Sequence, residues 1–152
     1  MRLAMVFLTC SLITLISGCN SYTLETAKKN GDLIVGFTEK VDYGKIEKFM
    51  NDVEHKRESS IRITSFTEEG DLILQDLHYD KQQIQYTYDN SRDEYGGKHK
   101  GKYKTECNNI EKKVVVAQDD YDREDYILTE CEKIIGTHNP DENEIYLLSK
   151  PM

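Results

Sequence analysis

Two cysteines in the second half of this chain constrain its fold more than any other feature. Cys107 is the first residue of the segment CNNIEKKVVVAQ, and Cys131 is the last residue of the segment REDYILTEC. A turn-forming stretch, DDYD, separates the two segments. A hairpin folded about Asp119 pairs residues whose numbers add up to 238. This register joins a cysteine pair, an apolar pair and a charge pair: Cys107 with Cys131, Ile110 with Leu128, and Lys113 with Asp125. Because one register satisfies all three, the sequence predicts an antiparallel hairpin closed by a Cys107–Cys131 disulfide.

The N-terminal residues carry the pattern of an export signal. Arg2 precedes an apolar run from Leu3 to Ile16, about 14 residues long, which is shorter than the roughly 20 residues that a membrane-spanning helix needs. The run ends in the motif ISGC at residues 16–19, which resembles the lipobox of bacterial lipoproteins. In such a motif, cleavage leaves the cysteine as the lipidated N-terminus. An ordinary cleaved signal with a nearby cysteine is the alternative.

The lipobox interpretation divides the chain into three parts. Residues 1–18 are a signal peptide, residues 19–31 are the lipidated Cys19 and a polar tether, and residues 32–152 are one α+β domain. Two acyl chains on Cys19 make a stable anchor, where one would be marginal. We therefore expect an exported protein, lipid-anchored on the extracytoplasmic face of the cell membrane. Cys10 leaves with the signal, so Cys107 and Cys131 remain as a pair in an oxidising compartment, where a disulfide is the default.

The charge balance limits the partners of this domain. The chain has 20 Lys and Arg against 28 Asp and Glu, a net charge of −8, which becomes −9 when Arg2 leaves with the signal. This acidic balance argues against general nucleic-acid binding and against a membrane-disrupting role. The chain has ten tyrosines and no tryptophan, and tyrosine suits half-buried sheets and binding surfaces.

Apolar spacing predicts one helix followed by a sheet. Residues 46, 49, 50 and 53 form one face of an amphipathic helix. The stretches SIRITSF, DLILQDLHY and QQIQYTYDN alternate as strands do, and DLIVGF (32–37) and NEIYLLS (143–149) are further strand candidates. If Ile61 pairs with Leu77 and Leu77 with Ile84, one face of a meander collects Ile61, Ile63, Ile73, Leu77, Ile84, Tyr86 and Tyr88. The predicted fold class is α+β, with one amphipathic helix packed on an antiparallel sheet built from this meander and the disulfide-linked hairpin.

The stretch between these two parts, YTYDNSRDEYGGKHKGKYKTEC, is the candidate binding loop. Its candidate residues are Asp89, Asn90, Arg92, Asp93, Tyr95, Lys98, Lys100, Lys102 and Lys104. The four lysines alternate, so on an extended chain they share one face and form a basic stripe. Such a stripe suits an anionic partner, for example a wall polymer, a lipid headgroup or an acidic protein. A charged edge strand that resists aggregation is the alternative.

Two specific ion sites are excluded by spacing. Asp89, Ser91 and Asp93 have the first three positions of an EF-hand loop, but Glu94 and Lys100 occupy the positions that need glycine and glutamate. The segment GGKHKGK lacks the pattern of a phosphate-binding loop and precedes a predicted strand rather than a helix. The sequence therefore predicts no metal site and no cofactor at this loop. A weak cation site of a type other than an EF-hand is the alternative.

The sequence contains no recognised catalytic motif. The four histidines are scattered, and none has a second histidine or a cysteine at metal-ligand spacing. The acidic pairs at 68–69 and 119–120 lie in predicted turns. We therefore predict a protein without enzymatic activity.

Several stretches resemble a known family. RITSFTEEGDLILQDLHYD, IQYTYDNSRDEYGGK, and a cysteine followed by IEKK with a second cysteine further on are similar to a domain of unknown function, number 4362, of small uncharacterised lipoproteins in bacilli and related Gram-positive bacteria. The resemblance covers roughly Asn30 to Tyr146. It implies a lipoprotein of the outer leaflet, and it implies no catalytic residues, because the family's role is unassigned.

The function expected from the sequence is that of a non-enzymatic binding or interaction module at the cell surface. Its partners would be the membrane, through the lipid on Cys19, and an anionic or protein partner at the loop. An inhibitor of a secreted or cell-wall enzyme is an alternative from another class. A small hydrolase with an unrecognised site is a further alternative.

Overall fold

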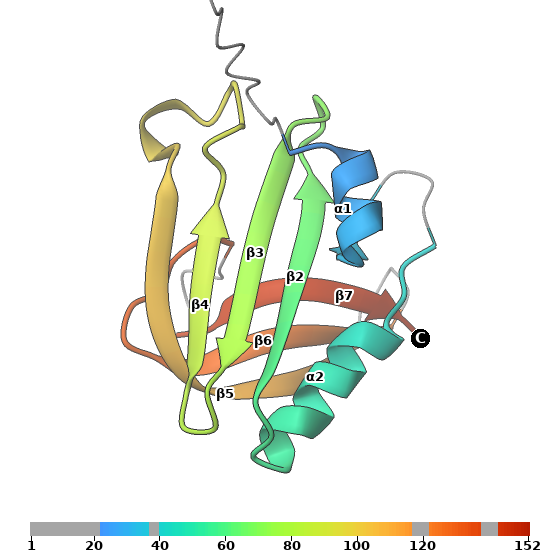
Figure 1. Cartoon of the computed structure of the whole chain (residues 1–152), viewed down its shortest axis with the longest axis vertical. Helices are drawn as coiled ribbons and strands as arrows, with labels where there is room; N and C mark the ends of the chain where they lie inside the picture. Colours follow the sequence, from blue (N-terminus) through green and yellow to red (C-terminus); the bar gives the residue numbers. More distant parts are fainter. Residues whose placement is uncertain (1–21, 37–39, 117–121, 138–142) are drawn as a thin grey trace, which may run out of the picture.

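The structure, a computed structural model, describes residues 22–36, 40–116, 122–137 and 143–152. The predicted signal peptide and Cys19 lie outside these described residues. The described elements are, in chain order, α1 (Leu24–Asn30), β1 (Leu33–Ile34), α2 (Gly44–Glu54), β2 (Ser59–Phe66), β3 (Leu72–Tyr79), β4 (Ile84–Asp89), the short 3-10 helix η1 (Gly97–His99), β5 (Lys102–Val115), β6 (Arg123–Cys131) and β7 (Ile145–Pro151). Figure 1 shows their arrangement.

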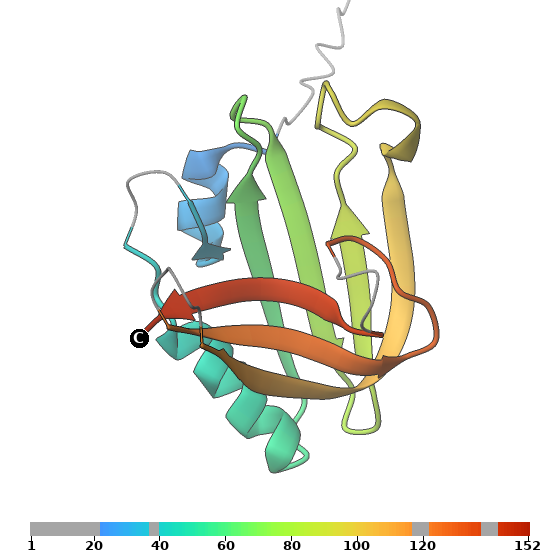
Figure 2. The same ribbon diagram turned by 180° about the vertical axis from the view of Figure 1, so that it is seen from behind.

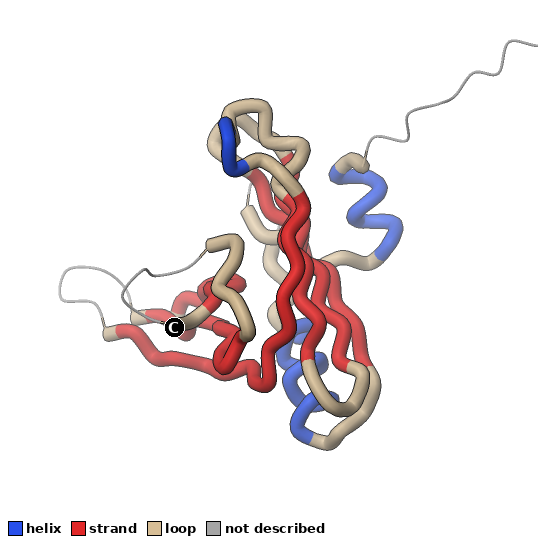
Figure 3. Tube along the Cα trace, turned by 90° about the vertical axis from the view of Figure 1, so that its left-hand side faces the viewer, coloured by secondary structure: helices blue, strands red, loops and turns tan. Residues whose placement is uncertain are grey.

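All seven strands belong to one sheet, in which spatial order follows chain order from β1 to β7. The β1–β2 pair is parallel and the other neighbours are antiparallel. β2, β3 and β4 stand side by side, whereas β6 and β7 cross behind them (Figures 1 and 2). Seen from the side, the sheet curls so that its two limbs face each other across an interior (Figure 3).

β5 causes this curl because it belongs to both limbs. It is 14 residues long and pairs with β4 near its start and with β6 over the rest of its length. Thr105 and Cys107 are buried in the first part, but Ile110 is buried in the second, so the inward-facing side shifts by one residue between them. On the neighbouring strand, Glu130 has a φ of 54°, which interrupts regular strand geometry at the same level. The strand therefore turns a corner there.

The fold-class prediction is wrong. The sequence suggested one helix packed on a sheet, whereas the chain forms a curled seven-stranded half-barrel with two small helices. The physical reason is that β5 joins the predicted meander to the predicted hairpin as one continuous strand, so most of the core lies between two parts of the same sheet. Helix α1, which covers the outer face of the sheet in Figure 3, begins in a segment that was expected to be a tether.

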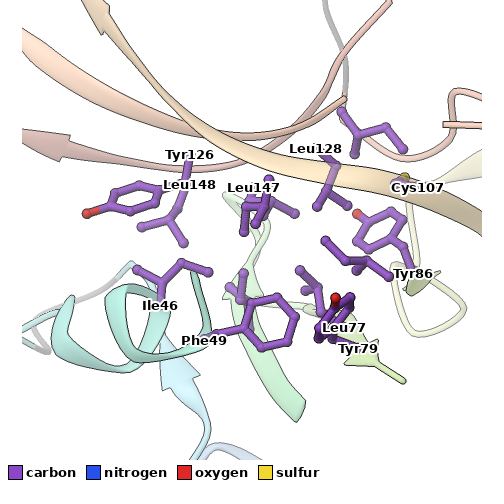
Figure 4. Close-up of a cluster of buried hydrophobic side chains, with 14 of the residues drawn as sticks. Ile46, Phe49, Leu77, Tyr79, Tyr86, Cys107, Tyr126, Leu128, Leu147 and Leu148 are labelled. Atoms are coloured by element: carbon purple, nitrogen blue, oxygen red, sulfur yellow. The ribbon is translucent and has the colours of Figure 1, made fainter. Parts of the chain in front are cut away.

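The core fills the space between the two limbs and is closed by α2 (Figure 4). Ile46 and Phe49 point from α2 toward Leu148 of β7 and Leu77 of β3, and all four side chains are buried. Burying a phenylalanine or leucine side chain contributes about 1.5–3 kcal/mol each. The apolar face of α2 therefore covers the opening that the curled sheet leaves.

A buried polar contact links the limbs through the core. Tyr86 of β4 donates a hydrogen bond from its hydroxyl to the Gln75 side chain (2.8 Å), and the Gln75 amide donates to the Leu147 carbonyl of β7 (3.3 Å). Burial raises the pKa of Tyr86 well above its usual range, so this hydroxyl remains a donor. Since unpaired polar groups are costly in a core, this contact favours a single arrangement of the two limbs.

The predicted hairpin register is confirmed. Cys107 pairs with Cys131, Ile110 with Leu128, and Lys113 with Asp125, and a disulfide joins the two cysteines. The prediction that Ile61 lies opposite Leu77 is also confirmed.

The predicted pairing of Leu77 with Ile84 is wrong by two residues. Leu77 lies opposite Tyr86, and Ile84 lies opposite Tyr79. The turn is longer than expected: residues 80–83 form it, and the Asp80 side chain accepts hydrogen bonds from the amides of Gln82 and Gln83. A shift of two residues preserves the side on which each side chain lies, so Ile84 and Tyr86 still face the core.

Glu47 attaches α2 to the second limb. Its carboxylate accepts hydrogen bonds from Lys150 of β7 (3.1 Å), Lys112 of β5 (3.4 Å) and the Tyr126 hydroxyl of β6 (3.2 Å). Tyr43, next to the helix, donates to the Ser149 carbonyl of β7 (3.1 Å). These contacts position the helix over the opening of the half-barrel.

We predict that the disulfide stabilises the fold by restricting the unfolded chain. The cysteines are 24 positions apart, a span for which loop entropy predicts about 3–4 kcal/mol. The double variant Cys107→Ala/Cys131→Ala should lose stability of that order in urea unfolding. As a control, peptide mapping without reductant should recover the two cysteines in one linked product; free thiols at both positions in the exported protein would contradict the prediction.

We predict that Glu47 makes stability depend on pH. The hydrogen bond from Lys150 lowers the pKa of Glu47 most, burial opposes it, and the charge of Lys112 and the bond from Tyr126 lower it further. Because the folded-state pKa lies below the ordinary 4.5, the stabilisation is complete above that pH and is lost as the pH falls through the folded-state pKa. Glu47→Gln should therefore unfold at a lower urea concentration than wild type at pH 7.

The difference between wild type and Glu47→Gln should shrink as the pH falls below about 4.5. Glu54→Gln at the exposed end of α2 is the matched control, measured by the same urea titrations. An equal effect of the two substitutions at pH 7, or a difference that grows on acidification, would argue against this role of Glu47.

Candidate functional site

The candidate binding residues lie in the connection between β4 and β5, at one end of the molecule (Figure 1). Asp89 is the last residue of β4, Lys102 is the first residue of β5, and they lie opposite each other. Lys104 follows in β5, opposite Thr87. The other candidates, Asn90, Arg92, Asp93, Tyr95, Lys98 and Lys100, belong to the segment between the strands, which we call loop 90–101.

Asn90 organises loop 90–101 from its base. Its side-chain oxygen accepts a hydrogen bond from the Gly101 amide (2.8 Å), and its side-chain amide donates to the His99 carbonyl (3.1 Å). Its backbone amide donates to the Gly101 carbonyl (3.0 Å). Asn90 is 8% exposed, so these bonds are made largely out of water. Asn90, the first residue of the loop, therefore closes it by bonding to its last residues.

The acidic half of the loop uses its carboxylates to build the loop. Asp89 accepts hydrogen bonds from the Ser91 amide (3.0 Å) and hydroxyl, and it forms an ion pair with Arg92 (3.3 Å). Burial raises the pKa of Asp89, but the bonds from Ser91 and the charge of Arg92 outweigh it, so the pKa lies below the ordinary value. Asp93 accepts from the Tyr95 amide (2.9 Å).

The carboxylates at this end of the molecule accept hydrogen bonds from the protein. The described residues contain no group of three or more histidine, cysteine, aspartate or glutamate residues that could hold a metal ion. Asp71, which lies between β2 and β3, accepts a hydrogen bond from the Glu94 amide of the loop (2.7 Å). Asp71, Asp89 and Asp93 each accept a protein N–H group, so all three help to hold the loop.

The predicted continuous stripe of four lysines is not formed. Lys98 lies in η1, Lys100 follows it, and Lys102 and Lys104 alone among the four are in a strand. The physical reason is the Gly-Gly pair: Gly97 has a φ of 56°, a conformation that favours glycine, and η1 turns the chain before β5 begins. The lysines are therefore divided between the loop and the outer face of β5.

The tip of the loop presents side chains that do not build it. Tyr95 is 75% exposed, and Lys98, His99 and Lys100 are exposed as well. No carboxylate in the described part of the chain forms an ion pair with Lys98, Lys100, Lys102 or Lys104. The tip thus combines an aromatic ring and positive charges on a rigid base.

A contact that sequence reasoning missed joins the loop to the N-terminal segment. The Tyr22 ring lies between two guanidinium groups, Arg62 of β2 (5.2 Å from the ring centroid) and Arg92 of loop 90–101 (5.8 Å). Its hydroxyl donates to buried Asp32, which also accepts from Thr64 (2.6 Å). Such cation–π contacts contribute about 0.5–1 kcal/mol each at exposed sites. No local sequence pattern indicated this contact, because its partners are distant in sequence.

A groove of about 620 Å³ lies between the C-terminal end of α1, α2 and the β2–β3 pair. Its charged lining is already engaged: Lys45 donates to the Gly31 and Asp32 carbonyls, and Arg62 pairs with Asp76. Ser60 and His78 form a hydrogen bond across the strands (2.8 Å) and are solvent-accessible. Within the described residues no carboxylate hydrogen-bonds the His78 ring, so the oriented third group of an activated nucleophile is missing.

A second network of hydrogen-bonded side chains, on β6 and β7, also differs from the arrangement around a catalytic nucleophile. Tyr146 donates to Ser149 (2.8 Å), and Ser149 donates directly to Asp125 without an intervening imidazole. A serine hydroxyl that donates its hydrogen bond directly to a carboxylate in this way makes a structural contact. The geometry of the described residues therefore adds nothing in favour of the hydrolase alternative.

Comparison with known proteins identifies one family model. The model described as "Domain of unknown function (DUF4362)" matches residues 30–122, a span of 93 of the 152 residues that includes β1 to β5 and the whole of loop 90–101. No curated protein and no solved structure matches the chain. Among the described residues, no helix is long and apolar enough to cross a membrane.

We predict that Asn90 controls the order of loop 90–101. Asn90→Ala leaves the Gly101 amide without its partner, a loss that costs about 1–3 kcal/mol where such a group is buried. It also removes one of the two donors to the His99 carbonyl, which keeps the Tyr103 hydroxyl (3.1 Å). Trypsin should then cleave faster after Lys98 and Lys100, which are otherwise held in the closed loop. Asn108→Ala, at an exposed site with one long hydrogen bond (3.4 Å), is the control. Unchanged cleavage rates in Asn90→Ala would contradict this role.

Proposed function

The chain belongs to the DUF4362 family, whose description assigns no activity, and we propose that it is a lipid-anchored binding module on the extracytoplasmic face of a Gram-positive cell membrane. In this proposal Cys19 carries the lipid and residues 1–18 are the export signal. The contact surface is the tip of loop 90–101 together with Lys102 and Lys104. The partner is anionic, and no chemical transformation is involved.

The observation that carries the proposal is that some side chains of loop 90–101 and its base close the loop, whereas others are exposed. Asn90, Asp89 and Asp93 hold the loop closed by accepting or donating hydrogen bonds within it. The side chains of Tyr95 and Lys98 are exposed and make none of these bonds. A rigid loop that presents uncommitted side chains is how binding surfaces are commonly built, because little conformational entropy is lost on binding.

Two further features support the membrane-anchored setting. The ISGC motif at residues 16–19 follows an apolar run of signal-peptide length. The disulfide between Cys107 and Cys131 suits an oxidising environment outside the cytoplasm. Both features come from different parts of the chain, and both agree with export.

The anchor is tested by following the protein in cells. Cys19→Ala should abolish incorporation of labelled fatty acid and move the protein from the membrane fraction to the medium. Cys10→Ala is the matched control and should leave both readouts unchanged. A protein that stays membrane-bound and labelled after Cys19→Ala would contradict lipidation at this position.

The contact surface is tested by crosslinking in intact cells. A photoreactive residue in place of Tyr95 should capture a partner, and Lys98→Gln/Lys100→Gln should lower the yield. Lys56→Gln/Lys81→Gln is the control. These exposed lysines belong to the α2–β2 connection and the β3–β4 turn, and both segments lie at the opposite end of the molecule (Figure 1). Equal yields from both double variants would remove the loop as the contact surface, and capture of a secreted enzyme would favour the inhibitor alternative.

A further inference from the structure

We propose that the anionic partner of loop 90–101 is the headgroup layer of the membrane that anchors the chain. This inference rests on the proposed function, because it requires the lipid on Cys19. It adds the identity of the partner, an anionic lipid surface, and the orientation of the domain, with loop 90–101 against the bilayer.

The first step is the short distance between the anchor and the domain. Tyr22 is three positions after Cys19, and three residues span about 10 Å when fully extended. Tyr22 is not free to move away from the domain: its hydroxyl donates to Asp32, and its ring lies against Arg62 and Arg92. The point at which Tyr22 joins the domain must therefore lie within about 10 Å of the lipidated residue.

The second step is that loop 90–101 lies beside that point. Arg92, which contacts the Tyr22 ring, belongs to the loop. The loop is also tied to the turn between β2 and β3 by the bond from the Glu94 amide to Asp71 (2.7 Å). Figure 1 shows the first described residues, this turn and the loop at one end, and the β3–β4 turn at the other. The anchor thus brings the loop end, rather than the β3–β4 end, to the membrane.

The third step is the chemistry of the loop tip. Tyr95, 75% exposed, is a residue type that is enriched at membrane interfaces, where its ring and hydroxyl meet apolar and polar layers at once. Lys98 and Lys100 are exposed. A lysine ammonium group on its flexible side chain can donate hydrogen bonds to the phosphate oxygens of a lipid headgroup. Each basic residue held close to an anionic leaflet favours the membrane-facing orientation roughly fivefold.

The acidic residues at the same end determine which part of it faces the lipid. Glu68 and Glu69, in the turn between β2 and β3, are exposed, and so is Glu94 in the loop. An anionic surface repels these carboxylates and attracts Lys98 and Lys100. The domain should therefore tilt so that the tip of loop 90–101 contacts the headgroups and the β2–β3 turn points away.

The overall acidity of the domain explains why the loop needs the anchor. With a net charge of −9 after signal removal, the domain alone is repelled by an anionic bilayer. Two acyl chains supply the affinity and keep the loop at the surface, within the distance over which its charges act. The loop then sets orientation rather than affinity.

The experiment uses the full lipidated protein in vesicles that contain phosphatidylglycerol. The chain has no tryptophan, so Tyr95→Trp provides a single fluorophore at the loop tip. Its emission should shift to shorter wavelength, and brominated lipids should quench it. Gln82→Trp, exposed in the β3–β4 turn at the opposite end, is the control and should show neither effect. Adding Lys98→Gln/Lys100→Gln to Tyr95→Trp should weaken quenching, whereas Lys56→Gln/Lys81→Gln should not.

The possible outcomes separate this inference from the proposed function. Mass spectrometry first establishes whether Cys19 carries the lipid; its absence overturns both. With the lipid present, three results would overturn the inference and leave the proposal of an anchored binding module intact. They are no quenching of Tyr95→Trp, equal quenching of Tyr95→Trp and Gln82→Trp, or unchanged quenching after Lys98→Gln/Lys100→Gln. Capture of a soluble protein by the crosslinker at 95, without crosslinks to lipid, likewise overturns the inference alone.

Discussion

The corner in β5 is the constraint on which the rest of this structure depends. Cys107 stands at that corner: it lies opposite Ile84 in one limb of the sheet and is bonded to Cys131 in the other. The buried side of the strand shifts by one residue between Cys107 and Ile110, so one continuous strand can line the core in both limbs. Without this shift Ile110 would lie on the outer side of the strand. The disulfide thus holds the sheet where its two parts diverge.

Some side chains hold the two limbs and the loop in place, and others are left exposed to solvent. Inside, Gln75 connects Tyr86 to the Leu147 backbone, and Glu47 fastens α2 over the opening. At the far end of β4 and β5, the loop is closed by its own polar side chains. Its tyrosine and lysines remain available to solvent, next to the attachment point of Tyr22. Proximity of a rigid, partly basic loop to the N-terminal segment is the basis of the membrane-facing orientation proposed above.

Sequence reasoning succeeded where a local pattern had one solution. The β5–β6 register followed from three pairs that a single alignment satisfies, and the β2–β3 register followed from matched apolar faces. The β3–β4 register was displaced by two residues because shifts of two preserve the faces, so apolar alternation cannot distinguish them; the Asp80 turn decides. The candidate loop was located correctly as the β4–β5 connection. Its lysines were assigned to one extended stripe because their alternation in the sequence gives no sign of the turn that Gly97 introduces.

The sequence by itself determined the disulfide partners, the positions of most strands and the start of the loop, because each depends on residues that are close in sequence or paired by a unique register. The tertiary structure alone decided that the sheet curls, because the shift in β5 depends on which side of each limb is buried. It also decided that Tyr22 lies between Arg62 and Arg92, residues 40 and 70 positions away. Contacts of that range arise when packing brings distant segments together, and no local periodicity encodes them.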